Sequence, residues 1–456
     1  MSKIRFEWDI ESQRIDRSDG EDPLAKRRRR RNIARLLLIL AMLVAMIALG
    51  ALIVRQRLID VENHFAQLLQ DTVKAEVAAL RIGDINSWLA AQATEPPGWI
   101  GQQRAAFQQY SDLKAAGAID LTGGILSVRI EGERARVLVQ ENIHNLPYSR
   151  LWFYRRTNSG WLHSAPDYSF WGEPRQYVGA GVRVAYRAVD QQFATELGPA
   201  LEDWLRRACD VFDCGDLPLL NVNVTPDSES AAGWRDERTL RLDIRSPYLE
   251  RARADAPFDG AYQQLVSQIL AERIINAHTN YRAAAYPHDA FYLRGAVTDW
   301  LAAYMTRKDG SNSLLDSLAA NYGAEAMARL LANLSATDSM AVLQHAIPVP
   351  LAQADLDWRD FIAWRLKLES ELIAARAEEA WLQLYDTSDD SVRRAAYARF
   401  NRNAPPQAYK VADHYIGTSD AGEPQLRASA KASDASQQQE AFVLFNLVNG
   451  VWKRAN

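Results

Sequence analysis

An uninterrupted apolar segment near the start of this 456-residue chain constrains it most. Residues 36–54 read LLLILAMLVAMIALGALIV, without a charged residue, and Arg35 and Arg55 bracket them. At ~1.5 Å rise per residue, a helix of these nineteen residues extends roughly 28 Å, close to the ~30 Å hydrocarbon core of a bilayer. A buried core helix is rarely so long and so cleanly bounded by arginines. We therefore predict a transmembrane helix and the lipid bilayer as a partner.

The flanking charges predict the direction in which this helix crosses the membrane. Six consecutive cations occupy positions 26–31, and the positive-inside rule keeps such a flank in the cytoplasm. A basic run also suits nucleic acid or anionic lipid, but beside an apolar span it orients the helix. A cleavable signal peptide is the competing interpretation, but the run is too long for one and lacks a small-residue cleavage site. We predict a disordered cytoplasmic tail (1–35) and an extracytoplasmic bulk on a bacterial cell membrane.

The amino-acid composition indicates that the exported part is folded and acidic. The whole chain is 48% hydrophobic with 13 Trp, which is enough apolar surface for packed cores. Its net charge is −4 although the tail is basic, so the exported part is acidic and we expect no nucleic-acid partner. The two cysteines, Cys209 and Cys214, lie on the exported side, where a disulfide is favoured over two free thiols. A zinc knuckle lacks the other ligands it needs.

The first exported segment, 56–175, changes from a helical to a strand pattern. Apolar residues at helical spacing give way to period-two alternation with turns between, ending in LWFYRRTNSGWLHSAP. Helices followed by a curved antiparallel sheet resemble the NTF2-like, cone-shaped α+β fold. Such cones often hold a pocket, for which the polar candidates here are His144, His163, Asp167 and Tyr168. The alternative is that these four residues occupy the rim or the turns.

The last segment, 356–456, repeats the order of the first. Three helical stretches precede four strands, and the chain ends in AFVLFNLVNGVWKRAN, two strands around Asn449 and Gly450. We predict a second NTF2-like domain. The expected fold class is thus multidomain α+β, with one transmembrane helix and an NTF2-like domain on each side of the middle segment.

The middle segment, 176–355, contains a strand at 240–244 followed by two strongly periodic helices. The stretch RLDIRSPYLERARADAPFDGAYQQLVSQILAERIINAH, with FYLRGAVTDWLAAYM after it, resembles the peptidase MA-like (gluzincin-type) metallopeptidase domain. The resemblance implies a strand beside a helix that bears His-Glu-x-x-His. It also implies a glutamate on the next helix as the third zinc ligand. Two histidines four apart lie on one helical face, and the adjacent glutamate activates the zinc-bound water.

This chain departs from that pattern at each chemical position. The resemblance places Ser267 and Ala271 at the histidines, Gln268 at the general base and Gly295 at the third ligand, while Asp299 keeps the acidic residue that follows. A neutral glutamine cannot take a proton from water as a carboxylate does. We therefore predict a pseudopeptidase with no metal and no other cofactor. An alternative metal site formed by His278, His288 and Asp299 stays open.

These features predict a non-catalytic binding or scaffolding protein at the bacterial cell surface. An extended peptide or protein partner is expected to add to the strand at 240–244 as an exposed sheet edge. One alternative is a transmembrane regulator that signals inward through the short tail. Another is a residual hydrolase with a relocated site.

Overall fold

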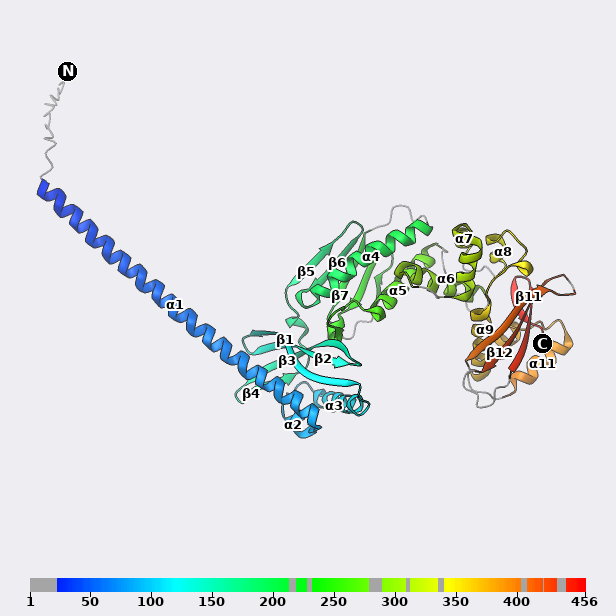
Figure 1. Cartoon of the computed structure of the whole chain (residues 1–456), viewed down its shortest axis with the longest axis horizontal. Helices are drawn as coiled ribbons and strands as arrows, with labels where there is room; N and C mark the ends of the chain where they lie inside the picture. Colours follow the sequence, from blue (N-terminus) through cyan, green and yellow to red (C-terminus); the bar gives the residue numbers. More distant parts are fainter. Residues whose placement is uncertain are drawn as a thin grey trace, which may run out of the picture.

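The structure of the protein is a computed structural model. It describes residues 23–212, 219–227, 232–278, 289–308, 312–334, 340–402, 408–420, 422–432 and 440–456. These residues form a mixed α+β chain with three sheets and one long helix that stands away from the rest (Figure 1). The predicted α+β class and the long apolar N-terminal helix are confirmed at this level.

The projecting helix, α1 (Pro23–Ile82), runs without a break from the basic cluster into the folded body. Its apolar stretch is fully exposed, and it is long and apolar enough to cross a membrane. Further along, Leu69 and Val73 are completely buried in the first apolar core. The predicted membrane-spanning segment and the helical segment that begins the first exported segment are therefore parts of one continuous helix.

The N-terminal unit packs the end of α1 and two further helices against an antiparallel sheet. Its other elements are α2 (Ile85–Ala90), α3 (Trp99–Ala115), β1 (Ile119–Glu131), β2 (Arg134–Ile143), β3 (Leu146–Thr157) and β4 (Gly160–Ser164). The strands pair in chain order, and β10 (Ala252–Arg253) from far along the chain adds to β3. The helix-then-sheet order is the one that the sequence predicts.

The middle unit contains a mixed sheet with helices beside it. Its strands are β5 (Pro174–Val178), β6 (Val182–Arg187), β7 (Leu220–Thr225), β8 (Gly233–Asp236) and β9 (Arg241–Arg245), arranged β5-β6-β7-β9-β8. Its helices are α4 (Gln191–Phe212), α5 (Gly260–His278), α6 (Asp289–Thr306), α7 (Ser313–Asn333) and α8 (Val342–Ala346), with short 3-10 turns at Ala188–Asp190, Pro247–Leu249 and Leu351–Gln353. A break at Gly323 (φ 75°) divides α7 into two helical stretches.

One prediction for the middle sheet is wrong. The strand at 240–244 was expected to form an exposed edge, but β9 lies between β7, which it pairs in parallel, and β8, which it pairs antiparallel. The short strand β8 thus covers the side at which a peptide was expected to add. Trp234 of β8 also donates its indole N–H to the backbone of Ile269 on α5.

The C-terminal unit repeats the architecture of the N-terminal unit. It comprises α9 (Arg359–Ala374), α10 (Glu378–Gln383), α11 (Asp390–Phe400), β11 (Tyr409–Thr418), β12 (Pro424–Ala432), β13 (Glu440–Val448) and β14 (Val451–Arg454), with strands paired in chain order. Its sheet shares one continuous apolar cluster with the middle unit, in which Trp358, Phe361 and Trp452 take part. The N-terminal unit instead has an apolar core of its own.

The two outer units correspond residue by residue. Four pairs of buried residues are separated by the same number of positions: Trp88 and Trp381, Glu76 and Glu369, Gln92 and Tyr385, and Phe107 and Phe400. Both indole N–H groups donate at 3.2 Å to the carbonyl 15 residues further along. An isolated parallel bridge joins Gln92 to His163 in one unit and Tyr385 to Arg454 in the other. The correspondence between the two outer units therefore includes their helices as well as their final hairpins.

Candidate functional site

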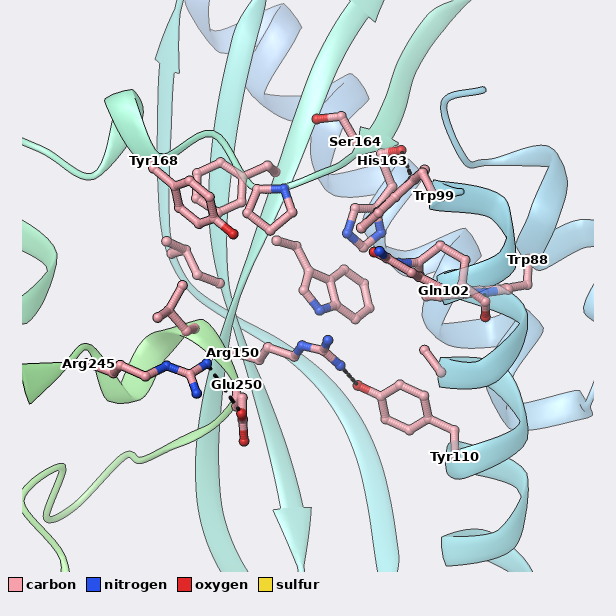
Figure 2. Close-up of a pocket in the computed structure, with 17 residues that line it drawn as sticks. Trp88, Trp99, Gln102, Tyr110, Arg150, His163, Ser164, Tyr168, Arg245 and Glu250 are labelled. Atoms are coloured by element: carbon pink, nitrogen blue, oxygen red, sulfur yellow. Dashed lines mark hydrogen bonds and ion pairs between the residues drawn. The ribbon is translucent and has the colours of Figure 1, made fainter. Parts of the chain in front are cut away.

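A cavity of about 340 Å³ lies where the N-terminal unit meets the middle unit. Figure 2 shows its lining converging from α2 and α3, from β3 and β4, and from the turn after β9. The lining residues are Trp88, Trp99, Gln102, Gln103, Ala106, Tyr110, Arg150, Leu151, Trp152, Phe153, His163, Ser164, Pro166, Tyr168, Arg245, Leu249 and Glu250. Ligand sites typically have volumes of roughly 300–1,000 Å³, so this one suits a small molecule or a single terminal residue of a chain.

A buried acid–imidazole pair forms one wall of the cavity. Nδ1 of His163, on β4, lies 2.8 Å from Oε2 of Glu76, on α1, and both side chains are almost fully buried. The amide of Gln92 donates to the same carboxylate oxygen at 3.5 Å. This carboxylate fixes the orientation of the imidazole, which leaves Nε2 as its second polar atom. Such an imidazole can bind a ligand by hydrogen bonding or exchange a proton with it.

Aromatic rings enclose this imidazole and much of the cavity. The His163 ring stacks on Trp152 at 5.0 Å and on Tyr154 at 5.1 Å between centroids. Trp88 and Trp99 meet it edge-on at 6.0 and 5.7 Å. Burial and the nearby Glu76 charge raise the pKa of Tyr154, which therefore stays a neutral phenol. Aromatic walls of this kind favour a planar or apolar ligand body.

The opposite side of the cavity carries positive charge. Arg150 of β3 donates to the phenol of Tyr110 at 3.4 Å, as Figure 2 shows. That phenol donates in turn to the buried carboxylate of Glu141, whose other oxygen lies 2.7 Å from Nε of Arg251. Burial, and then the charge of Glu141, raise the pKa of Tyr110. The Glu141 carboxylate thus interacts with Tyr110 and Arg251 rather than with Arg150.

The middle unit completes the cavity with residues that follow β9. Ser246 caps the 3-10 turn Pro247–Leu249 by accepting from the backbone N–H of Tyr248, and this turn positions Leu249 and Glu250. Arg245 at the end of β9 pairs with Glu250 at 3.6 Å. Ser246 also donates to the carboxylate of Asp190, so the turn is held by a buried acidic residue.

Asp190 links Trp171 to Ser246 and so joins the two units. Its second oxygen accepts the indole N–H of Trp171 at 2.9 Å, and Trp171 belongs to a small apolar cluster that also contains Tyr248. Burial raises the pKa of Asp190 to about 7, although the hydrogen bonds from Ser246 and Trp171 oppose the shift. The junction therefore contains a carboxyl group that changes protonation near neutral pH.

The structure brings two of the four predicted N-terminal candidates together at the cavity. His163 and Tyr168 line it. His144, with φ of 48°, forms the turn between β2 and β3. Asp167 instead caps the 3-10 turn Tyr168–Phe170 and pairs with Arg134 at 3.0 Å. Sequence reasoning missed Arg150 and Arg245, because these arginines become neighbours only when the two units meet.

The peptidase-like positions lie on packed neighbouring helices. Gln268 on α5 donates to the carboxylate of Asp299 on α6 at 2.8 Å. Ser267 and Ala271 are buried on α5, and Ser267 donates to the backbone carbonyl of Gln264. Gly295 is exposed on α6. A glutamine–aspartate hydrogen bond therefore occupies the place at which the resemblance implies zinc chemistry.

Two further predictions concern residues that are only partly described. His288, the His278 side chain and Cys214 lie outside the described parts of the structure, so the alternative metal site stays a prediction. Cys209 is disulfide-bonded. Within the described residues, no group of three or more His, Cys, Asp or Glu side chains is placed to hold a metal.

Two comparisons with known proteins were informative only in finding no match. A scan of the chain against protein-family models finds no match, and a search of curated proteins finds none either.

Proposed function

We propose that the protein is a membrane-anchored, extracytoplasmic binding protein of the bacterial surface, and that its ligand occupies the cavity between the N-terminal and middle units. The observation that carries this proposal is the convergence of aromatic, cationic and imidazole side chains from two units on one 340 Å³ space. Arginines that outnumber the nearby carboxylates, and a cavity where two units meet, are more typical of ligand sites than of packed cores.

In this proposal α1 is the anchor and its basic flank faces the cytoplasm. The exposed apolar stretch and the cations at 26–31 support that orientation. The outer units are NTF2-like domains, and the middle unit is a peptidase MA-like domain without catalysis. The Gln268–Asp299 hydrogen bond supports the last point because it joins two side chains that together offer no pair of imidazole ligands.

A matched pair of variants on α3 tests whether the cavity is the binding site. Ala106 lines the cavity, whereas Ala105 beside it is exposed to solvent. The full-length protein in nanodiscs should show saturable quenching of tryptophan fluorescence with members of a diverse small-molecule set. Ala106→Trp should abolish that quenching, and Ala105→Trp should leave it intact. Quenching that survives Ala106→Trp, or that is absent for every compound, would contradict the proposed binding site.

The absence of catalysis in the middle unit has its own test. Metal analysis of the purified full-length protein should find no stoichiometric zinc, and casein should stay intact after long incubation. One tightly held zinc per chain would overturn the pseudopeptidase assignment.

A second candidate function, transmembrane regulation, rests on the continuity of α1. The same helix that crosses the proposed membrane buries Leu69, Val73 and Val77 in the core of the ligand-binding unit. A rigid helix can pass a rotation or tilt of that unit to its cytoplasmic end. Replacing residues 1–25, with the cations at 26–31 kept, should disable a regulator and leave a simple anchor unaffected.

A further inference from the structure

We propose that the ligand of this cavity is a monoanion, a carboxylate on a planar and largely apolar body, and that Arg150 and Arg245 bind its acidic group. This inference rests on the proposed function and narrows it to one chemical class. It depends on how the charged groups of the cavity are partnered and on the nature of the walls around them.

Arg150 is a half-buried cation that lacks a counter-ion in the described parts of the protein. Its one hydrogen bond, to the neutral phenol of Tyr110, is long at 3.4 Å. The nearby carboxylate of Glu141 pairs with Arg251 at 2.7 Å and also accepts from Tyr110. A charge withdrawn from water without a partner is costly, and a ligand carboxylate would remove that cost. The planar guanidinium matches a carboxylate by donating two parallel hydrogen bonds.

Arg245 supplies the second cation and is only weakly held. Its pair with Glu250 spans 3.6 Å, and the Glu250 side chain is 81% exposed. An ion pair so open to solvent contributes little. Nε of Arg245 is buried and has no hydrogen-bond partner among the described residues. An acidic group within the cavity would satisfy this N–H while Glu250 stays in solvent.

The charge balance of the lining sets the charge of the ligand. The charged residues in the lining itself are Arg150, Arg245 and the exposed Glu250, while the buried carboxylate of Glu76 is engaged by His163 in the wall. The two guanidinium groups thus exceed the exposed carboxylate by one positive charge, which a monoanion neutralises. A phosphate monoester carries close to two negative charges at neutral pH and would leave excess negative charge in a partly buried site.

The side chains that line the cavity determine which kind of ligand framework fits beside the acidic group. Trp88 and Trp99 line the cavity on one side and Tyr168 lines it on another, and Trp152 is also part of the lining. The indole N–H groups of Trp88 and Trp99 already donate to backbone carbonyls, so these two rings offer mainly apolar surface. Flat aromatic surface favours a flat partner, which can stack or meet it edge-on.

Calorimetric titration with three naphthalene probes tests the inference on the full-length protein in nanodiscs, with empty nanodiscs as the blank. The probes are 2-naphthoate, the neutral 2-naphthamide and 2-naphthyl phosphate. We expect 2-naphthoate to bind with one site per chain. The amide should bind about tenfold more weakly because it lacks the charge-assisted hydrogen bonds of the carboxylate, and the phosphate about tenfold more weakly because its second negative charge stays unneutralised in a partly buried site.

Arginine variants locate the acidic group. Arg150→Gln and Arg245→Gln should each weaken 2-naphthoate about tenfold and leave the weak binding of 2-naphthamide unchanged, which also shows that the cavity still folds. Arg129→Gln is the control, because Arg129 is an exposed β1 residue that pairs with Glu131 away from the cavity. It should leave the affinity for 2-naphthoate unchanged.

The outcomes separate this inference from the proposed function. Equal affinity for the carboxylate and the amide, tighter binding of the phosphate, or unchanged affinity in both cavity variants would overturn the monoanion assignment. Failure of 2-naphthoate to bind would overturn it too. The proposed function falls only if binding is insensitive to Ala106→Trp or if no compound of the wider set binds.

Discussion

The two outer units share one helix-then-sheet frame but surround different interiors. In the N-terminal unit, Glu76 pairs with His163 beside an open cavity. At the matching positions of the C-terminal unit, Glu369 lies 2.5 Å from Arg454, and Tyr385 donates to it at 3.3 Å. The first pair joins a carboxylate to an imidazole, and the second joins a carboxylate to a guanidinium group.

The units also differ in how they join the middle unit. The sheet of the C-terminal unit is part of one continuous apolar cluster with the middle helices. The N-terminal unit meets the middle unit through strand β10, a small aromatic cluster and the polar contacts of Asp190. A repeated frame can therefore surround a cavity in one unit and a buried ion pair in the other, depending on which side chains fill its interior. Three predictions test this comparison.

The largest effect is expected from the buried pair of the C-terminal unit. Arg454→Leu leaves the buried carboxylate of Glu369 with the Tyr385 phenol and the more distant Arg365 guanidinium, at 3.7 Å, and should destabilise this unit by about 3–5 kcal/mol. His163→Leu in the N-terminal unit should cost less, about 1–3 kcal/mol. Hydrogen exchange of the amides in β11–β14 and β1–β4 measures each loss locally. Lys410→Ala, at an exposed position of β11, is the control, and a larger loss for His163→Leu would refute the comparison.

An intermediate effect on stability is expected from the side chain of Asp190, at the junction of the N-terminal and middle units. The pKa of Asp190 is raised to about 7 in the folded protein, against roughly 3.9 when unfolded. Between these values the unfolded state releases a proton that the folded state keeps, so the contribution of Asp190 to stability falls as pH rises from about 4 to about 7, then stays constant. The total loss is up to about 4 kcal/mol.

Asp190→Asn tests this sign, because asparagine imitates the protonated acid. The melting temperature of the wild type minus that of the variant should decrease steadily from pH 4 to pH 7 and level off above it. A difference that is flat or rises with pH would contradict a protonated Asp190 at the junction.

The smallest effect, and the sharpest test of equivalence, comes from the paired tryptophans. Trp88→Phe and Trp381→Phe each remove an indole N–H that donates at 3.2 Å to a carbonyl. Local hydrogen exchange should show similar losses of about 1–2 kcal/mol in the two units. Only Trp88→Phe should alter ligand affinity, since Trp88 alone lines the cavity. Clearly unequal stability losses would show that the two frames are not equivalent.

Much of the secondary structure could be predicted because it depends on local periodicity. The three helical stretches and four strands expected in the last segment match α9–α11 and β11–β14, and the two periodic helices expected after the strand at 240–244 match α5 and α6. The short strands β8 and β10 were missed because four and two residues carry no readable alternation. Missing β8 led directly to the wrong edge assignment for β9.

The candidate site was predictable only in part. His163 and Tyr168 stand in a polar–aromatic stretch that draws attention in the sequence. Glu76 is 87 residues from His163, and nothing in its helix marks it as a buried partner. Arg251 is 110 residues from Glu141, and it is this pairing that leaves Arg150 without a carboxylate.

The sequence by itself determined the long apolar helix and the order of helices and strands in both outer units. These properties depend on the composition and spacing of neighbouring residues, which the chain carries whatever its fold. The tertiary structure decided which carboxylates pair with which cations, which strand forms the edge of the middle sheet, and where two units leave a cavity. Those properties arise from contacts between residues distant in sequence, and so only packing creates them.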